Sequence, residues 1–194
     1  FTFAVMFLAA LITGSLASRL KQHAGQAARD AYRLKVLLDT NQLLQQAKGK
    51  TEILEGAAQQ IVKLLKRETV IYDVKDGKLE HPLRRVPQGE EDITIEDEAC
   101  EEQAAAWALE NNRHAGTGTD HFKQAKRQYL AIRVNSTVYG VVGIMIRKQP
   151  LDAFENSVLL SILGECALAL ENDKNVREKE EAAILAKNEQ LRAN

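Results

Sequence analysis

The chain has 194 residues, of which 45% are hydrophobic, so it is long enough for one domain with an ordinary core and additional segments. Its formal net charge is −1, which gives no reason to expect nucleic acid as a partner. The two cysteines, Cys100 and Cys166, are far apart in the sequence, and we expect both to be reduced thiols. The chain begins with Phe1 rather than methionine, and we expect it to be part of a longer protein.

The first 17 residues, FTFAVMFLAALITGSLA, contain no charge. A membrane-spanning helix needs roughly 20 apolar residues, so we interpret residues 1–18 as the end of such a helix. A buried core helix is one alternative. A signal peptide is another, although no basic residue precedes the apolar run.

Basic residues follow the apolar run directly. Residues 19–35 contain five basic residues and one acid, Asp30, so this stretch has a net charge of +4 (five minus one). Such residues mark the cytoplasmic end of a membrane span and attract anionic lipid head groups. A solvated helix face is the alternative. The membrane-surface basic cluster predicted here consists of Arg19, Lys21, Arg29, Arg33 and Lys35.

Residues 19–48 contain only one glycine, Gly25, and are rich in good helix formers, which predicts a juxtamembrane helix. A three-four spacing within it predicts a dimer seam made of Leu34, Leu37, Asn41 and Leu44. A buried Asn41 paired with its twin would fix the register of the dimer. The alternative is that these leucines cap the domain that follows. Thr51 is expected to cap the next helix, residues 52–67.

The remaining pattern predicts an α+β domain with an antiparallel sheet and helices on at least one face. Asp76-Gly77 predicts a hairpin between strands 68–74 and 79–86, and Pro82 favours an edge position or early termination of the second strand. Gly140 and Gly143 suggest a bend or a close backbone approach. The other expected elements are a helix over 96–112, a mobile loop over 114–120, strands over 129–134 and 138–146, and a long helix capped by Asp152. The acids between residues 90 and 102 are expected to be solvated, with a metal site as the alternative.

The string AAWALENNRHAGTGTDHF, residues 105–122, resembles the GAF-domain signature of KdpD-type osmosensitive potassium sensor histidine kinases. The matching residues are Trp107, Ala115, Gly116, Gly118, Thr119 and Asp120. The first 20 residues resemble the last membrane helix of these proteins. The resemblance implies a GAF-like sensory domain over residues 49–170 and, over residues 171–194, a helix leading to the kinase dimerisation domain.

The same resemblance implies a bacterial inner-membrane sensor that responds to potassium limitation or osmotic stress. The globular domain would be cytoplasmic, and the partners would be a response regulator and a second copy in a parallel homodimer. ATP would bind in the kinase domain of the parent protein. The family's phosphoacceptor histidine lies in an S-H-[DE]-x-[RK]-x-P motif, and none of the four histidines here has that context.

The sequence therefore predicts no catalytic residue, metal site or cofactor for this chain. A domain of this type can hold a small molecule between its sheet and the helix that carries Trp107, and the candidate lining is Tyr72, Trp107, Thr117, Thr119 and Tyr129. The alternatives are core packing for the aromatic residues and turn chemistry for the threonines. A regulatory domain of a soluble enzyme or transcription factor is the alternative function.

Overall fold

The computed structural model describes residues 25–89, 97–147 and 149–192. The chain divides into two compact units, Phe1–Leu38 and Asp39–Asn194. Residues 25–46 are helical, within the predicted juxtamembrane helix. The predicted membrane segment, residues 1–18, lies outside the described residues, as do Arg19 and Lys21.

A five-stranded antiparallel sheet in the order β2-β1-β5-β4-β3 forms the centre of the second unit. Its strands are β1 (Thr69–Lys75), β2 (Lys78–Arg85), β3 (Ala115–Gly116), β4 (Arg127–Val134) and β5 (Thr137–Met145). The predicted α+β class with an antiparallel sheet is confirmed. The short strand β3 was not predicted, because its two residues lie in a stretch of small residues that we interpreted as a mobile loop.

The hairpin between β1 and β2 turns at Asp76 and Gly77, as predicted. Both residues have positive φ angles, 51° and 73°, which is the backbone required by a two-residue type I′ turn. β2 is an edge strand, so the missing N–H of Pro82 leaves no gap between two neighbouring strands. This position in the sheet was also predicted.

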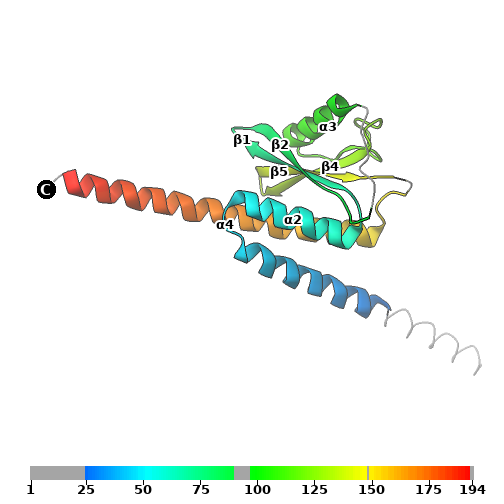
Figure 1. Ribbon diagram of the computed structural model, residues 1–194, viewed down its shortest axis with the longest axis horizontal. Helices are drawn as coiled ribbons and strands as arrows, with labels where there is room; N and C mark the ends of the chain where they lie inside the picture. The colour runs from blue at the N-terminus through cyan, green and yellow to red at the C-terminus, as the bar shows by residue number, and fades with distance from the viewer. Residues whose placement is uncertain (1–24, 90–96, 148, 193–194) are drawn as a thin grey trace, which may run out of the picture. The chain divides into compact units, whose positions relative to one another are not determined.

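Helices cover both faces of the sheet (Figure 1). α3 (Glu98–Asn111) lies on one face, and α2 (Lys50–Leu65) lies with the first half of α4 (Ala153–Arg192) on the other. Side chains of β1 alternate between the two layers, and Val70 and Tyr72 belong to the cluster that packs against the alanines of α3. The domain therefore has two apolar layers separated by the sheet.

Two glycines in β5 allow the close approach that the sequence suggested. A Cβ atom on Gly143 would lie 2.5 Å from Cε1 of Tyr129 and 2.7 Å from Cγ1 of Val70. On Gly140 it would lie 2.9 Å from the carbonyl oxygen of Tyr72. The absence of side chains here makes room for the buried tyrosines.

The helix boundaries differ from the prediction in one informative place. α2 begins at Lys50, so Thr51 lies in its first turn and the prediction that Thr51 is the N-cap was wrong. The N-cap is Gly49, whose φ of 89° is unfavourable for other residues. By contrast, Asp97 caps α3 by accepting a 2.9 Å hydrogen bond from the Cys100 backbone N–H.

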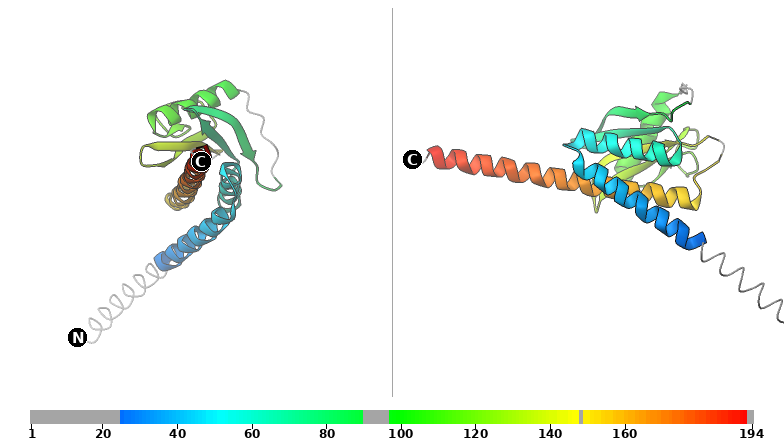
Figure 2. Two further views of the ribbon diagram at one scale, coloured as in Figure 1. Left: turned by 90° about the vertical axis from the view of Figure 1, so that its left-hand side faces the viewer. Right: turned by 60° about the horizontal axis from the view of Figure 1, so that its bottom comes forward.

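α4 has 40 residues, and only its first half belongs to the core. Its buried residues end at Leu170, and residues 172 and 174–192 are exposed. Among the described residues, α4 is the one helix long and apolar enough to cross a membrane by length and composition. Because that apolar half packs on the sheet, we interpret it as a core helix of the domain (Figure 2).

Candidate functional site

A cavity of about 590 Å³ lies between the β1–β2 hairpin and α3. This is the predicted location, between the sheet and the helix that carries Trp107. Residues of the hairpin and of one face of α3 line it: Tyr72, Gly77, Lys78, Leu79, Glu80, Pro82, Glu102, Ala106, Leu109 and Glu110. A cleft of this size is in the range of small-molecule sites.

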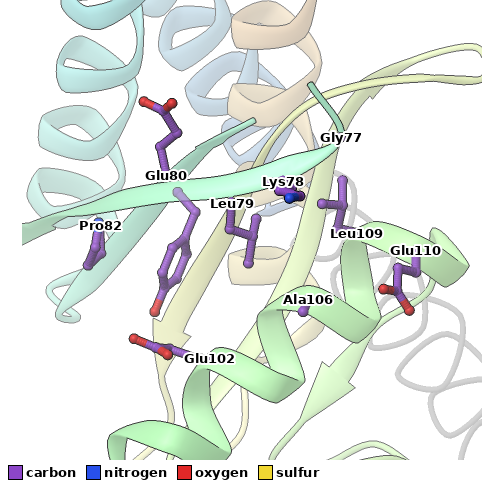
Figure 3. A pocket seen from close by; sticks show the side chains of 10 residues that line it. Gly77, Lys78, Leu79, Glu80, Pro82, Glu102, Ala106, Leu109 and Glu110 are labelled. Carbon is purple, nitrogen blue, oxygen red and sulfur yellow. The ribbon is translucent and has the colours of Figure 1, made fainter. Parts of the chain in front are cut away.

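Apolar and charged side chains both line the cavity (Figure 3). Leu79 and Pro82 point from β2 towards α3. On α3, Ala106 is flanked by Glu102 and Glu110, one turn before and one turn after it on the same helix face. The Glu80 side chain points away from the cavity.

Tyr72 gives the cavity an aromatic wall on the side of the sheet, and only 5% of the residue is exposed. Burial raises the pKa of its hydroxyl, although the nearby Arg127 acts in the opposite direction. Its ring lies 6.4 Å, centroid to centroid, from the tilted ring of Tyr129. The lining of the cavity is therefore in contact with the core beneath it.

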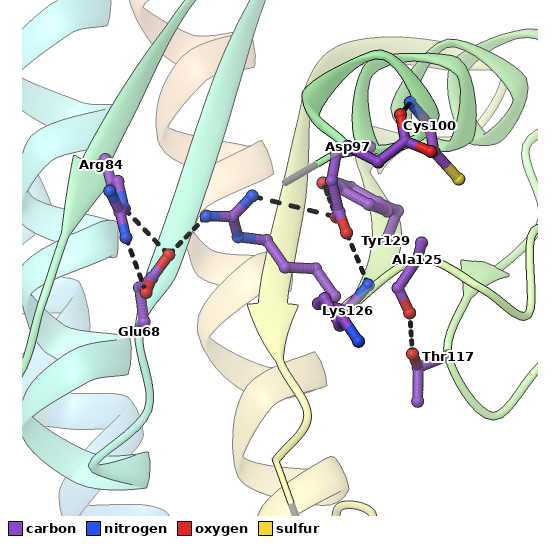
Figure 4. Close-up of polar contacts among 10 residues, drawn as sticks. Glu68, Arg84, Asp97, Cys100, Thr117, Ala125, Lys126 and Tyr129 are labelled. Carbon is purple, nitrogen blue, oxygen red and sulfur yellow. Dashed lines mark hydrogen bonds and ion pairs between the residues drawn. The ribbon is translucent and has the colours of Figure 1, made fainter. Parts of the chain in front are cut away.

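A buried ionic network lies next to this core. Glu68, immediately before β1, is fully buried and accepts hydrogen bonds from two guanidinium groups. Arg84 of β2 donates from Nε at 2.9 Å and from Nη2 at 3.0 Å, and Arg127 of β4 donates from Nη2 (Figure 4). This bidentate pairing compensates for the cost of burying the carboxylate.

The network continues to α3 through a second buried carboxylate, Glu101. Nη1 of Arg127 lies 3.8 Å from Oε2 of Glu101, which also accepts a 2.6 Å hydrogen bond from the Tyr129 hydroxyl. The other oxygen of Glu101 accepts from the Lys126 backbone N–H. Polar contacts thus connect the α2–β1 junction with the helix that forms one wall of the cavity.

The environment shifts the pKa values of these groups in opposite directions. Burial by itself would raise the pKa of Glu68, but the hydrogen bonds from Arg84 and Arg127 outweigh it, so the pKa lies below its usual value. Burial and the hydrogen bond to Glu101 raise the pKa of Tyr129. At neutral pH Glu68 is therefore ionised, Arg127 is charged and Tyr129 is neutral.

The structure places one of the five predicted lining residues, Tyr72, on the cavity. Tyr129 is completely buried in the core. Thr119 donates to the carbonyl oxygen of Gly116 at 2.8 Å, and Thr117 donates to that of Ala125, so both hydroxyls stabilise the loop. Trp107 stacks on His121, with ring centroids 4.1 Å apart. Tyr129 and the two threonines thus match the alternatives of core packing and turn chemistry. Trp107 packs against the core cluster as well as against the His121 ring.

The residues of the predicted dimer seam have different environments in the structure. Leu44 is only 3% exposed, and it lies next to the position where a Cβ of Gly56 would point. The side-chain amide of Asn41 donates a 2.8 Å hydrogen bond to Glu165 of α4. Both residues thus have partners within their own chain. Leu34, in the first unit, is 59% exposed.

Sequence reasoning missed most of the lining and the whole ionic network. The spacing of Glu102, Ala106 and Glu110 was a usable signal, because residues four apart share one helix face. No such signal marks Glu68 and Arg127, which are 59 positions apart. In the described ranges, no three His, Cys, Asp or Glu residues are grouped so that they could hold a metal ion.

The antiparallel sheet with α3 on one face and two helices on the other is the fold of a GAF domain. The GAF domain of the Escherichia coli potassium sensor histidine kinase KdpD superposes with a TM-score of 0.59 at 20% identity, covering 74% of this chain and 96% of that one. The GAF domain of a Pseudomonas syringae pv. tomato sensor histidine kinase, described as putative, gives a TM-score of 0.51 at 13% identity, covering 84% and 97%.

The sequence is similar to KdpD sensor proteins over essentially its whole length, which confirms the resemblance found in residues 105–122. Sensor protein KdpD of Clostridium acetobutylicum is 28% identical over 196 residues, covering 100% of this chain and 22% of that protein. The Escherichia coli K12 protein is 27% identical over 194 residues, covering 98% and 21%. The chain thus spans about a fifth of these relatives. No protein-family model matches it.

Proposed function

We propose that this chain is the cytoplasmic sensory and signal-transmission module of a membrane two-component sensor histidine kinase. The observation that carries the proposal is the alignment with KdpD sensor proteins along the whole chain, together with the GAF fold. The chain itself has no catalytic role in this proposal. The parent protein would bind ATP in its kinase domain and transfer phosphate to a response regulator.

In this arrangement residues 1–18 end a membrane helix and residues 19–48 connect it to the GAF domain, residues 49–170. Arg29, Arg33 and Lys35 are exposed on the helix of residues 25–46, which supports a role at an anionic membrane surface. The location would be the inner membrane of a bacterium. The stimulus would be potassium limitation or osmotic stress, by analogy with the potassium sensor whose GAF domain shares the fold.

Residues 171–194 would lead to the dimerisation domain of the kinase, in a parallel homodimer. The exposed second half of α4 supports this, because an isolated helix of that length is only marginally stable in water without a partner. For the incoming helix, Leu34 is the exposed member of the seam, while Leu37 is half-buried. A cysteine at position 34 should crosslink between copies more readily than one at the buried position 44.

The decisive experiment changes the helical phase of α4 in the parent kinase, that is, the rotation of its C-terminal end relative to the GAF domain. Deleting residues 182–183 rotates the following helix by about 200°, whereas deleting residues 178–184, one heptad, rotates it by only about 20°. We expect the short deletion to change the autophosphorylation rate in membrane vesicles and the heptad deletion to preserve it. Equal activities in both deletion variants would show that α4 does not transmit the signal through its phase.

A further inference from the structure

Glu102 and Glu110 are two carboxylates at opposite ends of the apolar wall that α3 contributes to the cavity. They are eight residues apart, which corresponds to about 12 Å along the helix axis. Between them the wall consists of Ala106 and Leu109, opposite Leu79 of β2. The cavity therefore places three apolar side chains between two carboxylates.

Neither Glu102 nor Glu110 makes an ion pair with another residue in the part of the chain that the structure describes. In contrast, buried Glu101, the sequence neighbour of Glu102, is fully engaged in the ionic network. The rim also contains Lys78, which has no acidic partner among the described residues. With Glu80 pointing away, two carboxylates and one ammonium group remain, a net charge of −1 (one minus two) at the cavity.

We propose that this cavity binds an organic ammonium compound with an apolar body, best of all a linear alkyl diamine. The methylene chain would lie on Ala106, Leu109 and Leu79, and each ammonium group would meet one carboxylate. An extended eight-carbon diamine separates its nitrogens by a distance similar to that between Glu102 and Glu110. Tyr72 would supply an aromatic face for the cationic end nearest the sheet. The proposal names the ligand class for the sensory role proposed above.

Chemically matched probes test the charge requirement. Octane-1,8-diamine, octane-1,8-diol and octanedioate have the same carbon chain but carry positive, zero and negative charge. Isothermal titration calorimetry on the full 194-residue chain in nonionic detergent should show heat of binding for the diamine only. Propane-1,3-diamine is too short to meet both carboxylates and should bind more weakly. A diol or dicarboxylate that binds as tightly as the diamine would overturn the proposal, as would absence of diamine binding.

Variants with opposite expected effects test the residues. Because both carboxylates are exposed at the rim, Glu102→Gln and Glu110→Gln should each weaken diamine binding about two- to five-fold. Lys78→Gln should strengthen it by a similar factor, since it removes a like charge. Glu189→Gln, the same change near the end of α4, is the control and should have no effect. Unchanged affinity in Glu102→Gln would exclude the assigned site even if the diamine binds.

This test is independent of the kinase proposal. Diamine binding to the chain does not require the parent kinase, and the deletions in α4 do not touch the cavity. If the diamine does not bind but the two deletions in α4 differ in activity, only the proposed ligand class is wrong. If the diamine binds but neither deletion changes the autophosphorylation rate, the proposed role of α4 in signal transmission is wrong.

Discussion

The hydroxyl of Tyr129 donates a 2.6 Å hydrogen bond to the Glu101 carboxylate, so that β4 and α3 are connected inside the core. Both residues are almost completely buried. Buried carboxylates without hydrogen bonds are costly, and this contact is one of the few that α3 makes through polar atoms. It joins the helix that forms one wall of the cavity to strand β4 of the sheet.

Removing this hydroxyl should destabilise the domain. Tyr129→Phe leaves Glu101 with one hydrogen-bond donor fewer in a buried position, and we expect the free energy of unfolding to fall by about 1–3 kcal/mol. Urea denaturation followed by circular dichroism measures it. Tyr139→Phe is the matched control, because the Tyr139 hydroxyl has no hydrogen bond to any described residue, and we expect a change within about 0.5 kcal/mol. Equal losses in the two variants would contradict the role of the hydrogen bond.

Glu68 should make stability depend on acid pH. Its pKa is lower in the folded than in the unfolded chain, so the ionised form stabilises the fold. This contribution is fully present above the unfolded pKa and is lost as the pH falls through the folded value. We therefore expect the urea midpoint of the wild type to decrease between pH 5 and pH 3, roughly the range of such a transition.

Glu68→Gln isolates this effect. The substitution should cost about 3 kcal/mol at neutral pH, because buried Arg127 loses the carboxylate that it hydrogen-bonds and keeps only Glu101, at 3.8 Å. Its urea midpoint should then fall less steeply with acid than that of the wild type. A variant whose acid profile runs parallel to the wild-type profile would show that another carboxylate is responsible.

Replacing Gly143 or Gly164 by alanine should change the free energy of unfolding in opposite directions. Gly143→Ala places a methyl group 2.5 Å from the Tyr129 ring, and we expect a loss of about 1–3 kcal/mol from overpacking. Gly164 lies within α4, and an added Cβ there meets nothing within 4 Å. Gly164→Ala should raise the free energy of unfolding by about 0.5–1 kcal/mol, because alanine is the better helix former. Thermal or urea unfolding of both variants decides the signs.

The stacking of Trp107 on His121 provides an optical reporter, because Trp107 is the single tryptophan of the chain. His121→Ala uncovers one face of the indole, and we expect the emission maximum to move to longer wavelength. The loop should also lose about 0.5–1 kcal/mol of local stabilisation. His114→Ala is the control, since the structure shows no ring contact of His114 with Trp107. An unchanged spectrum in His121→Ala would mean that the two rings are not stacked in solution.

Local chemistry made the hairpin predictable. Asp76-Gly77 encodes its turn without reference to the rest of the chain, and Pro82 restricts its strand to an edge. The position of Gly143 was also visible, because glycine in a strand marks a close approach. Such features depend on a few neighbouring residues, and the sequence shows those neighbours directly.

The site could be predicted only in outline. Glu101 and Glu102 are adjacent and chemically identical, yet one is buried in an ionic network and the other lines a cavity. Their different positions depend on how α3 is rotated on the sheet, and its alanine-rich sequence has no sharp apolar stripe that would reveal the rotation. Likewise, arginine is normally found at the surface. Arg127 can be buried because it pairs with carboxylates that are far from it in the sequence.

The continuity of α4 has a mechanical consequence. The part beyond the core, residues 171–192, is about 33 Å long, so a tilt of only about 5° at the sheet would displace its far end by roughly 3 Å. A helix of this length would convert a small tilt at the sheet into a larger displacement at its far end. If ligand binding at the cavity tilted α4, spin labels near Ala183 would detect the displacement far from the residues that a ligand would touch.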